Sequence, residues 1–132
     1  MWERHSKRNE RGQTFVEFAL ALPVLTVLLF GVIQFGLTFH DYVTLADASR
    51  AGARKATVSR TLAPGARNGA VEGAVRASAQ NLDQTKLTAA VSSTWVKGSD
   101  VTVTATYPYT IRLFGIPVTS GTLSSSTTER VE

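Results

Sequence analysis

The pattern of apolar positions divides the chain into a long uncharged run and a shorter mixed part. Residues 18–40 carry no Asp, Glu, Lys or Arg, and the polar side chains among them are Thr26, Gln34, Thr38 and His40. As a helix this run would be about 34 Å long at about 1.5 Å per residue, enough to cross a hydrocarbon core of about 30 Å. We therefore predict one transmembrane helix from about residue 16 to 38, and assign residues 13–40 to the membrane-spanning part of the chain.

Helical character continues beyond the apolar run, to about Arg60. Small residues recur every four positions at Ala48, Gly52 and Ala56, a spacing that lets two helix backbones approach closely. Two interpretations of this stripe are open: it packs against another helix in a membrane or filament bundle, or it packs on its own domain. Pro64-Gly65 then breaks the helix.

The second half of the chain changes from a helical to a strand-like pattern. Residues 68–82 place their apolar positions on one face and predict a second, short helix. After Asp83 the period becomes two, in residues 87–95 and more clearly in 101–109, with a turn signal at Gly98-Ser99-Asp100.

The C-terminal stretch contains residues that interrupt strands. Pro108 should end regular pairing or lie on an edge. Residues 111–121 contain two glycines and a proline and are predicted to form a loop, followed by a last strand over residues 122–131. The predicted fold is therefore α+β: a long N-terminal transmembrane helix that continues into a small extracytoplasmic domain, residues 41–132, with a short second helix and an antiparallel sheet of about three strands.

Charge placement predicts the orientation of the helix. Basic residues crowd its N-terminal flank, namely Arg4, Lys7, Arg8 and Arg11, whereas Asp41 and Asp47 follow the apolar run. The positive-inside rule then places the N-terminus in the cytoplasm and the C-terminal part outside the cell membrane. A secretory signal peptide is disfavoured, because its apolar core is usually about 7–15 residues long and ends in the cleavage site.

The residues that usually carry chemistry are scarce. There is no cysteine, and the two histidines, His5 and His40, fall on opposite sides of the predicted membrane. No phosphate-binding glycine-rich loop with lysine and no close carboxylate pair occurs in the outer part. We predict no catalytic residue, no metal site and no cofactor. Nucleic acid is not an expected partner, since no basic stripe with interleaved aromatic residues follows the N-terminal charges.

One acid, Glu17, lies at the entrance to the apolar run, five residues after Gly12. An ionisable group at the edge of a membrane helix is costly and usually has a partner or a function. Two interpretations are open on the residues alone: Glu17 serves a specific interaction, or it is an interfacial acid flanking a plain single-pass anchor.

An ordered combination of motifs begins with Gly12-Gln13-Thr14-Phe15-Val16-Glu17-Phe18, followed by Ala19-Leu20-Ala21-Leu22-Pro23 and the apolar run. This combination resembles the TadE-like family, the minor pilins or pseudopilins of tight-adherence (Flp-type) pilus systems. Residues 31–36 resemble the end of the family's membrane helix. Residues 48–54 resemble the small-residue segment with paired arginines that follows it, and residues 123–132 are similar to its last strand.

This resemblance implies a processing and assembly site. A prepilin peptidase would cut between Gly12 and Gln13 on the cytoplasmic side, so that residues 1–12 are a leader and Glu17 and Phe18 become the fifth and sixth residues of the mature chain. The new ammonium at Gln13 could then be neutralised by Glu17 of a neighbour in a low-dielectric bundle. The implied partners are the membrane, the prepilin peptidase, other pilin or pseudopilin subunits and the pilus assembly platform.

Two functional classes follow from these observations. The first is a processed pseudopilin that acts in assembly or initiation of a tight-adherence, type IV-like pilus and can enter an extracellular pilus. The second is an uncleaved single-pass module that displays its small sheet to an extracytoplasmic partner.

Overall fold

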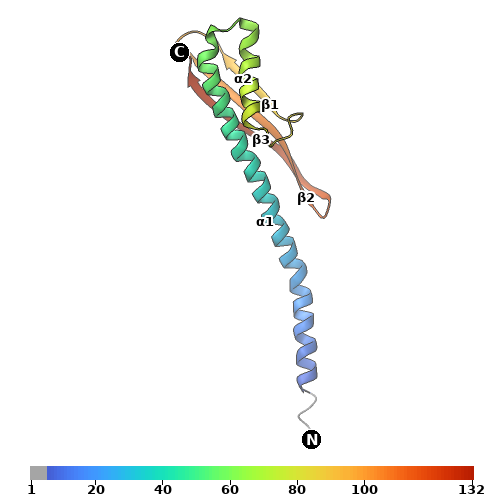
Figure 1. Cartoon of the computed structure of the whole chain (residues 1–132). Coiled ribbons are helices and arrows are strands. Elements are labelled where there is room, and N and C mark those ends of the chain that lie inside the picture. The colour runs from blue at the N-terminus through green and yellow to red at the C-terminus, as the bar shows by residue number, and fades with distance from the viewer. Residues whose placement is uncertain (1–5) are drawn as a thin grey trace.

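A helix of 53 residues, α1 (Ser6–Val58), is the main axis of the molecule. The structure is a computed structural model and describes residues 6–132, so Arg4 and His5 of the predicted leader lie outside the described residues. At about 1.5 Å per residue α1 is about 80 Å long, and it runs without interruption through Pro23. Its N-terminal half extends alone, and its C-terminal half carries the other elements (Figure 1).

The second helix begins at the predicted break. A single 3-10 turn, η1 (Ser59–Thr61), ends the first helix, and α2 (Pro64–Ser78) starts directly after it. Proline is tolerated at the first helical position because the N–H it lacks would have no partner there. The helix therefore lies about four residues earlier than predicted. Leu82, which was assigned to it, lies in the following turn and is still buried.

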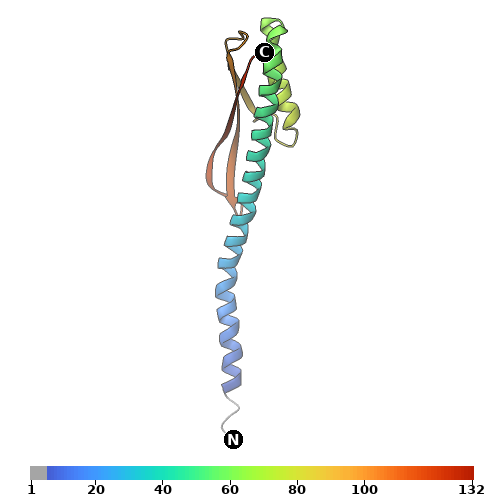
Figure 2. The ribbon, with the colours of Figure 1, turned by 90° about the vertical axis from the view of Figure 1, so that its left-hand side faces the viewer.

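Three antiparallel strands complete the fold, and the predicted α+β class is confirmed. They are β1 (Thr88–Ser93), β2 (Asp100–Leu113) and β3 (Ile116–Arg130), in the spatial order β1-β2-β3. The alternation in β2 gives the sheet one apolar face, which is covered by the helices, and one face rich in threonine and serine. Figure 2 shows the sheet lying along one side of α1.

The prediction of a loop over residues 111–121 is wrong, because these residues form the end of a long β-hairpin. β2 continues to Leu113, and a turn of two residues, Phe114-Gly115, leads directly into β3. Both turn residues have positive φ, 50° and 83°, as a type I′ hairpin turn requires. The glycines and the proline suggested a loop, but a register shift after Ile111 lets the pairing continue past Pro117.

The edge prediction for Pro108 agrees with the observed pairing. β1 pairs with β2 only as far as Thr106, while Pro108 is paired with Thr122 of β3. Pro108 therefore lies in the part of β2 that has one neighbouring strand, where a missing N–H is tolerated.

A single hydrophobic core joins both helices and the sheet, and the stripe of small residues on α1 is part of it. Ala48 and Ala56 are fully buried. At Gly52 an added Cβ would lie only 2.5 Å from Cγ2 of Val75 on α2 and 3.0 Å from Cγ1 of Val103 on β2. Of the two interpretations of the stripe, the described structure shows the second, in which it packs within its own domain.

Candidate processing and assembly site

The predicted processing residues lie together on the exposed N-terminal part of α1. Gly12 is exposed, and a Cβ added there would meet no atom within 4 Å. Nε2 of the next residue, Gln13, donates a hydrogen bond of 3.1 Å to Oε1 of Glu17, one turn further along the helix. Phe18 follows with 62% of its surface exposed. All four residues are therefore accessible, and we call residues 12–18 the lip of the predicted span.

The apolar run beyond this lip is uncovered. Among the described residues one helix is long and apolar enough to cross a membrane, and none of its most apolar 18-residue window is buried within the chain. A continuous exposed surface of this kind is not stable in water and needs lipid or other helices around it.

Polar groups inside the run are satisfied locally. The hydroxyl of Thr26 donates to the carbonyl of Leu22 at 2.8 Å, and the hydroxyl of Thr38 donates to the carbonyl of Gln34 at 3.0 Å. Hydrogen bonds of this kind let Thr occupy a membrane helix without an unsatisfied hydroxyl. Pro23 has no N–H, so the carbonyl of Ala19 loses its usual helical partner.

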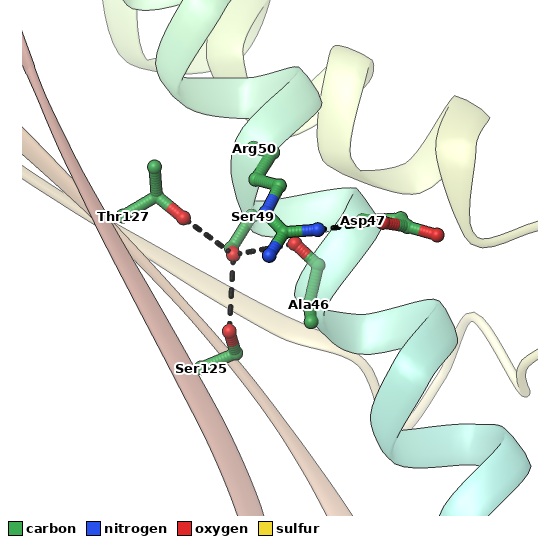
Figure 3. Close-up of polar contacts among 6 residues, drawn as sticks. All are labelled: Ala46, Asp47, Ser49, Arg50, Ser125 and Thr127. Carbon is green, nitrogen blue, oxygen red and sulfur yellow. Dashed lines mark hydrogen bonds and ion pairs between the residues drawn. The ribbon is translucent and has the colours of Figure 1, made fainter.

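A buried hydroxyl fixes the helix to the sheet near the end of α1. Ser49 is fully buried, and its Oγ donates to the carbonyl of Ala46 at 2.9 Å (Figure 3). Oγ of Ser125 lies 3.1 Å away and Oγ1 of Thr127 lies 2.9 Å away. A hydroxyl has one donor and two acceptor positions, so these three contacts use all of them when Ser125 and Thr127 donate.

The arginines beside this cluster point outward. Arg50 and Arg54 are exposed, and Arg50 forms an ion pair of 3.2 Å with Asp47 in which both side chains are more than half exposed. An exposed pair of this kind contributes little to stability. The segment therefore presents small residues to the core and guanidinium groups to the surroundings.

The outer part shows ordinary structural chemistry in its polar groups. The pKa of Asp83 is lowered, chiefly because the Thr85 hydroxyl and backbone N–H donate hydrogen bonds to its carboxylate. His40 contacts the Asn81 amide at 3.1 Å. Within the described residues no group of three His, Cys, Asp or Glu side chains is placed to hold a metal ion.

The family match covers the exposed lip at the start of α1 and the segment around Ser49. Residues 12–54 match the family model described as TadE-like protein. This segment of the chain is TadE-like. The match begins at Gly12 and ends at Arg54, so it includes the accessible lip, the whole apolar run, Ser49 and Gly52. No curated protein and no solved structure matches the chain significantly.

The resemblance stated from the motifs is confirmed over the matched residues. Sequence reasoning missed the role of Ser49 in this segment, because a serine beside a stripe of small residues does not reveal that two hydroxyls from β3 approach it. The only local signal was its position next to Ala48.

We predict that Ser49→Ala lowers the free energy of unfolding of the chain by about 1–3 kcal/mol, since Ser125 and Thr127 lose a buried partner. The matched control is Ser126→Ala, whose hydroxyl bonds Thr104 at 2.6 Å on the exposed face of the sheet. It should change stability by at most about 0.5 kcal/mol. Denaturant unfolding of the full chain in detergent, followed by circular dichroism, measures both. Equal effects of the two variants would contradict the assigned role of Ser49.

Proposed function

We propose that this chain is a TadE-like minor pilin, or pseudopilin, that is processed by a prepilin peptidase and acts in assembly or initiation of a tight-adherence, type IV-like pilus. The observation that carries the proposal is the exposed lip from Gly12 to Phe18 at the start of a long, uncovered apolar helix. This arrangement lies within the TadE-like segment. The TadE-like pilin family is generally non-enzymatic.

The helix has two uses in this proposal. Before assembly, residues 13–40 anchor the chain in the cell membrane, with residues 1–12 in the cytoplasm and the domain of residues 41–132 outside. During assembly the same apolar surface exchanges lipid for the helices of neighbouring pilin or pseudopilin subunits on the assembly platform. The uncovered state of the run in the single chain suits both environments.

Glycine at position 12 suits a peptidase site inside a helix. A peptidase takes its substrate in extended form, so the first turns of α1 must unwind locally. Gly is about 1 kcal/mol less favourable than Ala in a helix interior, and it adopts extended geometry with no side chain in the way. In the described structure a Cβ added at Gly12 would meet no other element within 4 Å, so no packing contact opposes local unwinding there.

Glu17 changes its partner after processing. In the described structure its carboxylate accepts a hydrogen bond from the neutral amide of Gln13 in the same helix. Cleavage places a positive ammonium on Gln13, and in a bundle of subunits a neighbour's Gln13 can approach Glu17 in a low-dielectric setting. There the two opposite charges attract each other in a way that a neutral amide cannot supply, so the processed form gains a specific contact between subunits.

Processing can be tested at Gly12 in its native membrane. We predict that the mature protein begins at Gln13, and that Gly12→Leu leaves the full chain uncleaved in the membrane because the side chain obstructs the extended backbone. Intact-mass measurement of the protein from native membranes distinguishes the two forms. Gly31→Leu is the matched control, since Gly31 is also exposed in α1 with nothing within 4 Å of an added Cβ. It should be cleaved normally.

The opposite result supports the second functional class. If the native protein retains residues 1–12, the processed pseudopilin is wrong. The uncleaved single-pass module, displaying its sheet to an extracytoplasmic partner, then becomes the better description.

A further inference from the structure

The hairpin of β2 and β3 extends well beyond the rest of the sheet. β1 stops pairing at Thr106, and residues 107–113 of β2 pair with β3 alone. We call residues 107–123 the ribbon. At about 3.4 Å per residue it extends roughly 24 Å past the three-stranded part. Both views show it running along α1 toward the N-terminus of the chain, with its turn beside the helix (Figures 1 and 2).

The tip of the ribbon touches α1 inside the apolar run. The rings of Phe114 and Phe30 have centroids 5.1 Å apart and are tilted by 54°. Phe30 is 37% exposed, less than any other large apolar side chain of the run. Gln34 and Thr38 follow on the same face of the helix at intervals of four residues and are half-buried. Gln34 and Thr38 therefore lie on the same side of α1 as Phe30, which the tip contacts.

The amino-acid composition of the tip differs from that of a turn exposed to water. Residues 113–118 are Leu-Phe-Gly-Ile-Pro-Val, with no charged or hydrogen-bonding side chain. Phe114, Ile116 and Val118 are 63%, 68% and 64% exposed. A type I′ turn favours Asn-Gly, whereas Phe114 occupies the left-handed region at φ 50°, at a cost of about 1–2 kcal/mol. A costly, exposed aromatic residue at this position indicates an apolar environment around the tip.

We propose that the tip of the ribbon inserts into the outer leaflet of the lipid bilayer beside α1. The inference rests on the proposed role of α1 as a membrane span. A helix needs about 20 residues to cross the hydrocarbon core, and counting from residue 16, where the span is predicted to begin, places the outer boundary near Phe35. Phe30 then lies about 8 Å inside that boundary. Phe114, in contact with Phe30, sits at a depth typical of interfacial apolar groups, about 5–10 Å.

The same geometry argues against a boundary at Thr38. The tip would then lie about 12 Å deep, and the open edges of the ribbon would enter hydrocarbon with unpaired backbone groups, which lipid cannot satisfy. The position of the ribbon therefore places the outer boundary of the span about one helical turn before Thr38, the residue expected from hydropathy.

A basic side chain, that of Arg112, lies at the level expected for the lipid headgroups. Arg112 is exposed, is paired in register with Pro117 and lies two residues before Phe114, about 7 Å along the strand. From there its guanidinium can reach lipid phosphates while its aliphatic stem covers the tip. The polar residues Thr119 and Ser120 follow the tip on β3. The change from the apolar tip to the polar residues Arg112, Thr119 and Ser120 matches the change from hydrocarbon to headgroups at a bilayer surface.

The absence of cysteine from the sequence makes a depth measurement straightforward. Single-cysteine variants of the full chain are spin-labelled in vesicles of phosphatidylcholine and phosphatidylglycerol, and their accessibility to oxygen and to a water-soluble nickel chelate is compared. Leu25→Cys reports the span, and Ser92→Cys reports the exposed face of β1. We expect the label at Val118→Cys to be accessible to oxygen and protected from nickel, like the label at Leu25→Cys. The label at Ser92→Cys should show the reverse.

A second variant separates lipid contact from turn formation. Phe114→Asn creates the Asn-Gly pair that the turn favours, so the ribbon should form at least as well. It removes the apolar anchor, however, and the label at Val118→Cys should become accessible to nickel in this background.

Each remaining outcome has a defined meaning. If the Val118→Cys label is nickel-accessible while the Leu25→Cys label is not, the tip does not insert and the inference is wrong, although the membrane span stands. If the Leu25→Cys label is itself nickel-accessible, the span fails and the inference with it. Protection of the Val118→Cys label from both reagents would mean that a second copy of the chain covers the tip, which also overturns the lipid proposal.

Discussion

Glu17→Leu is expected to leave the protein folded and inserted in the membrane, yet to reduce its incorporation into the pilus by more than a hundredfold. Glu17 is exposed, and in the described structure it bonds Gln13 of the same helix. Its loss therefore removes no contact with the core, which lies in residues 45–131. In the assembled bundle the variant would leave the ammonium of a neighbouring Gln13 without its counter-charge. An unpaired buried charge costs roughly 3–5 kcal/mol, which corresponds to more than two powers of ten in an equilibrium.

The measurement compares the amount of protein in sheared pili with the amount in the membrane, and circular dichroism of the purified variant checks the fold. Glu17→Gln serves as the matched variant, because it keeps the shape and the hydrogen bond to the Gln13 side chain but removes the charge. It should also fail to assemble. Normal assembly of Glu17→Leu would rule out the pseudopilin mechanism. If only Glu17→Gln assembled normally, the contact between subunits would be a neutral hydrogen bond and not a charge pair.

Gly52→Leu is expected to destabilise the outer domain severely. Its Cβ alone would lie 2.5 Å from Cγ2 of Val75 and 3.0 Å from Cγ1 of Val103, so α2 and β2 must both move away from α1. Overpacking of a core costs about 1–3 kcal/mol, and occasionally more. Because domains of this kind are stable by only about 5–15 kcal/mol, and about 1 kcal/mol shifts the Tm by about 4–8 °C, a drop of about 4–24 °C should be observed.

Gly73→Leu is the control for this substitution. Gly73 lies in α2, is exposed and has nothing within 4 Å of an added Cβ. The same change there should raise stability by up to about 1 kcal/mol, through helix propensity alone. Thermal unfolding of both full-length variants in detergent, followed at a strand-sensitive wavelength, gives the comparison. Similar Tm values for the two variants would show that the helices do not approach each other at Gly52 as described.

Local patterns determined much of this architecture from the sequence. The apolar run predicted the long helix, and its continuation to about residue 60 is confirmed by α1 and η1. The alternation around Val101 and Val103 predicted the buried face of β2, which is confirmed. The lip from Gly12 to Glu17 was equally legible, because its signal consists of a few residues at fixed spacing. Periods and short motifs are properties of neighbouring residues, so they can be recognised without the fold.

Other features depended on contacts between distant parts of the chain. Hydropathy could not tell whether Gly52 faces a second chain or its own α2, since the same stripe of small residues suits either neighbour. The bonds of Ser49 to β3 join residues more than 70 positions apart. The hairpin turn at Phe114 carries no ordinary turn residue in its first position, and its meeting with Phe30 follows from how far two paired strands extend beside a helix. The sequence by itself therefore determined most of the elements and indicated the candidate processing site. The tertiary structure decided how far the hairpin extends and which surfaces are covered, because burial depends on packing between residues far apart in the chain.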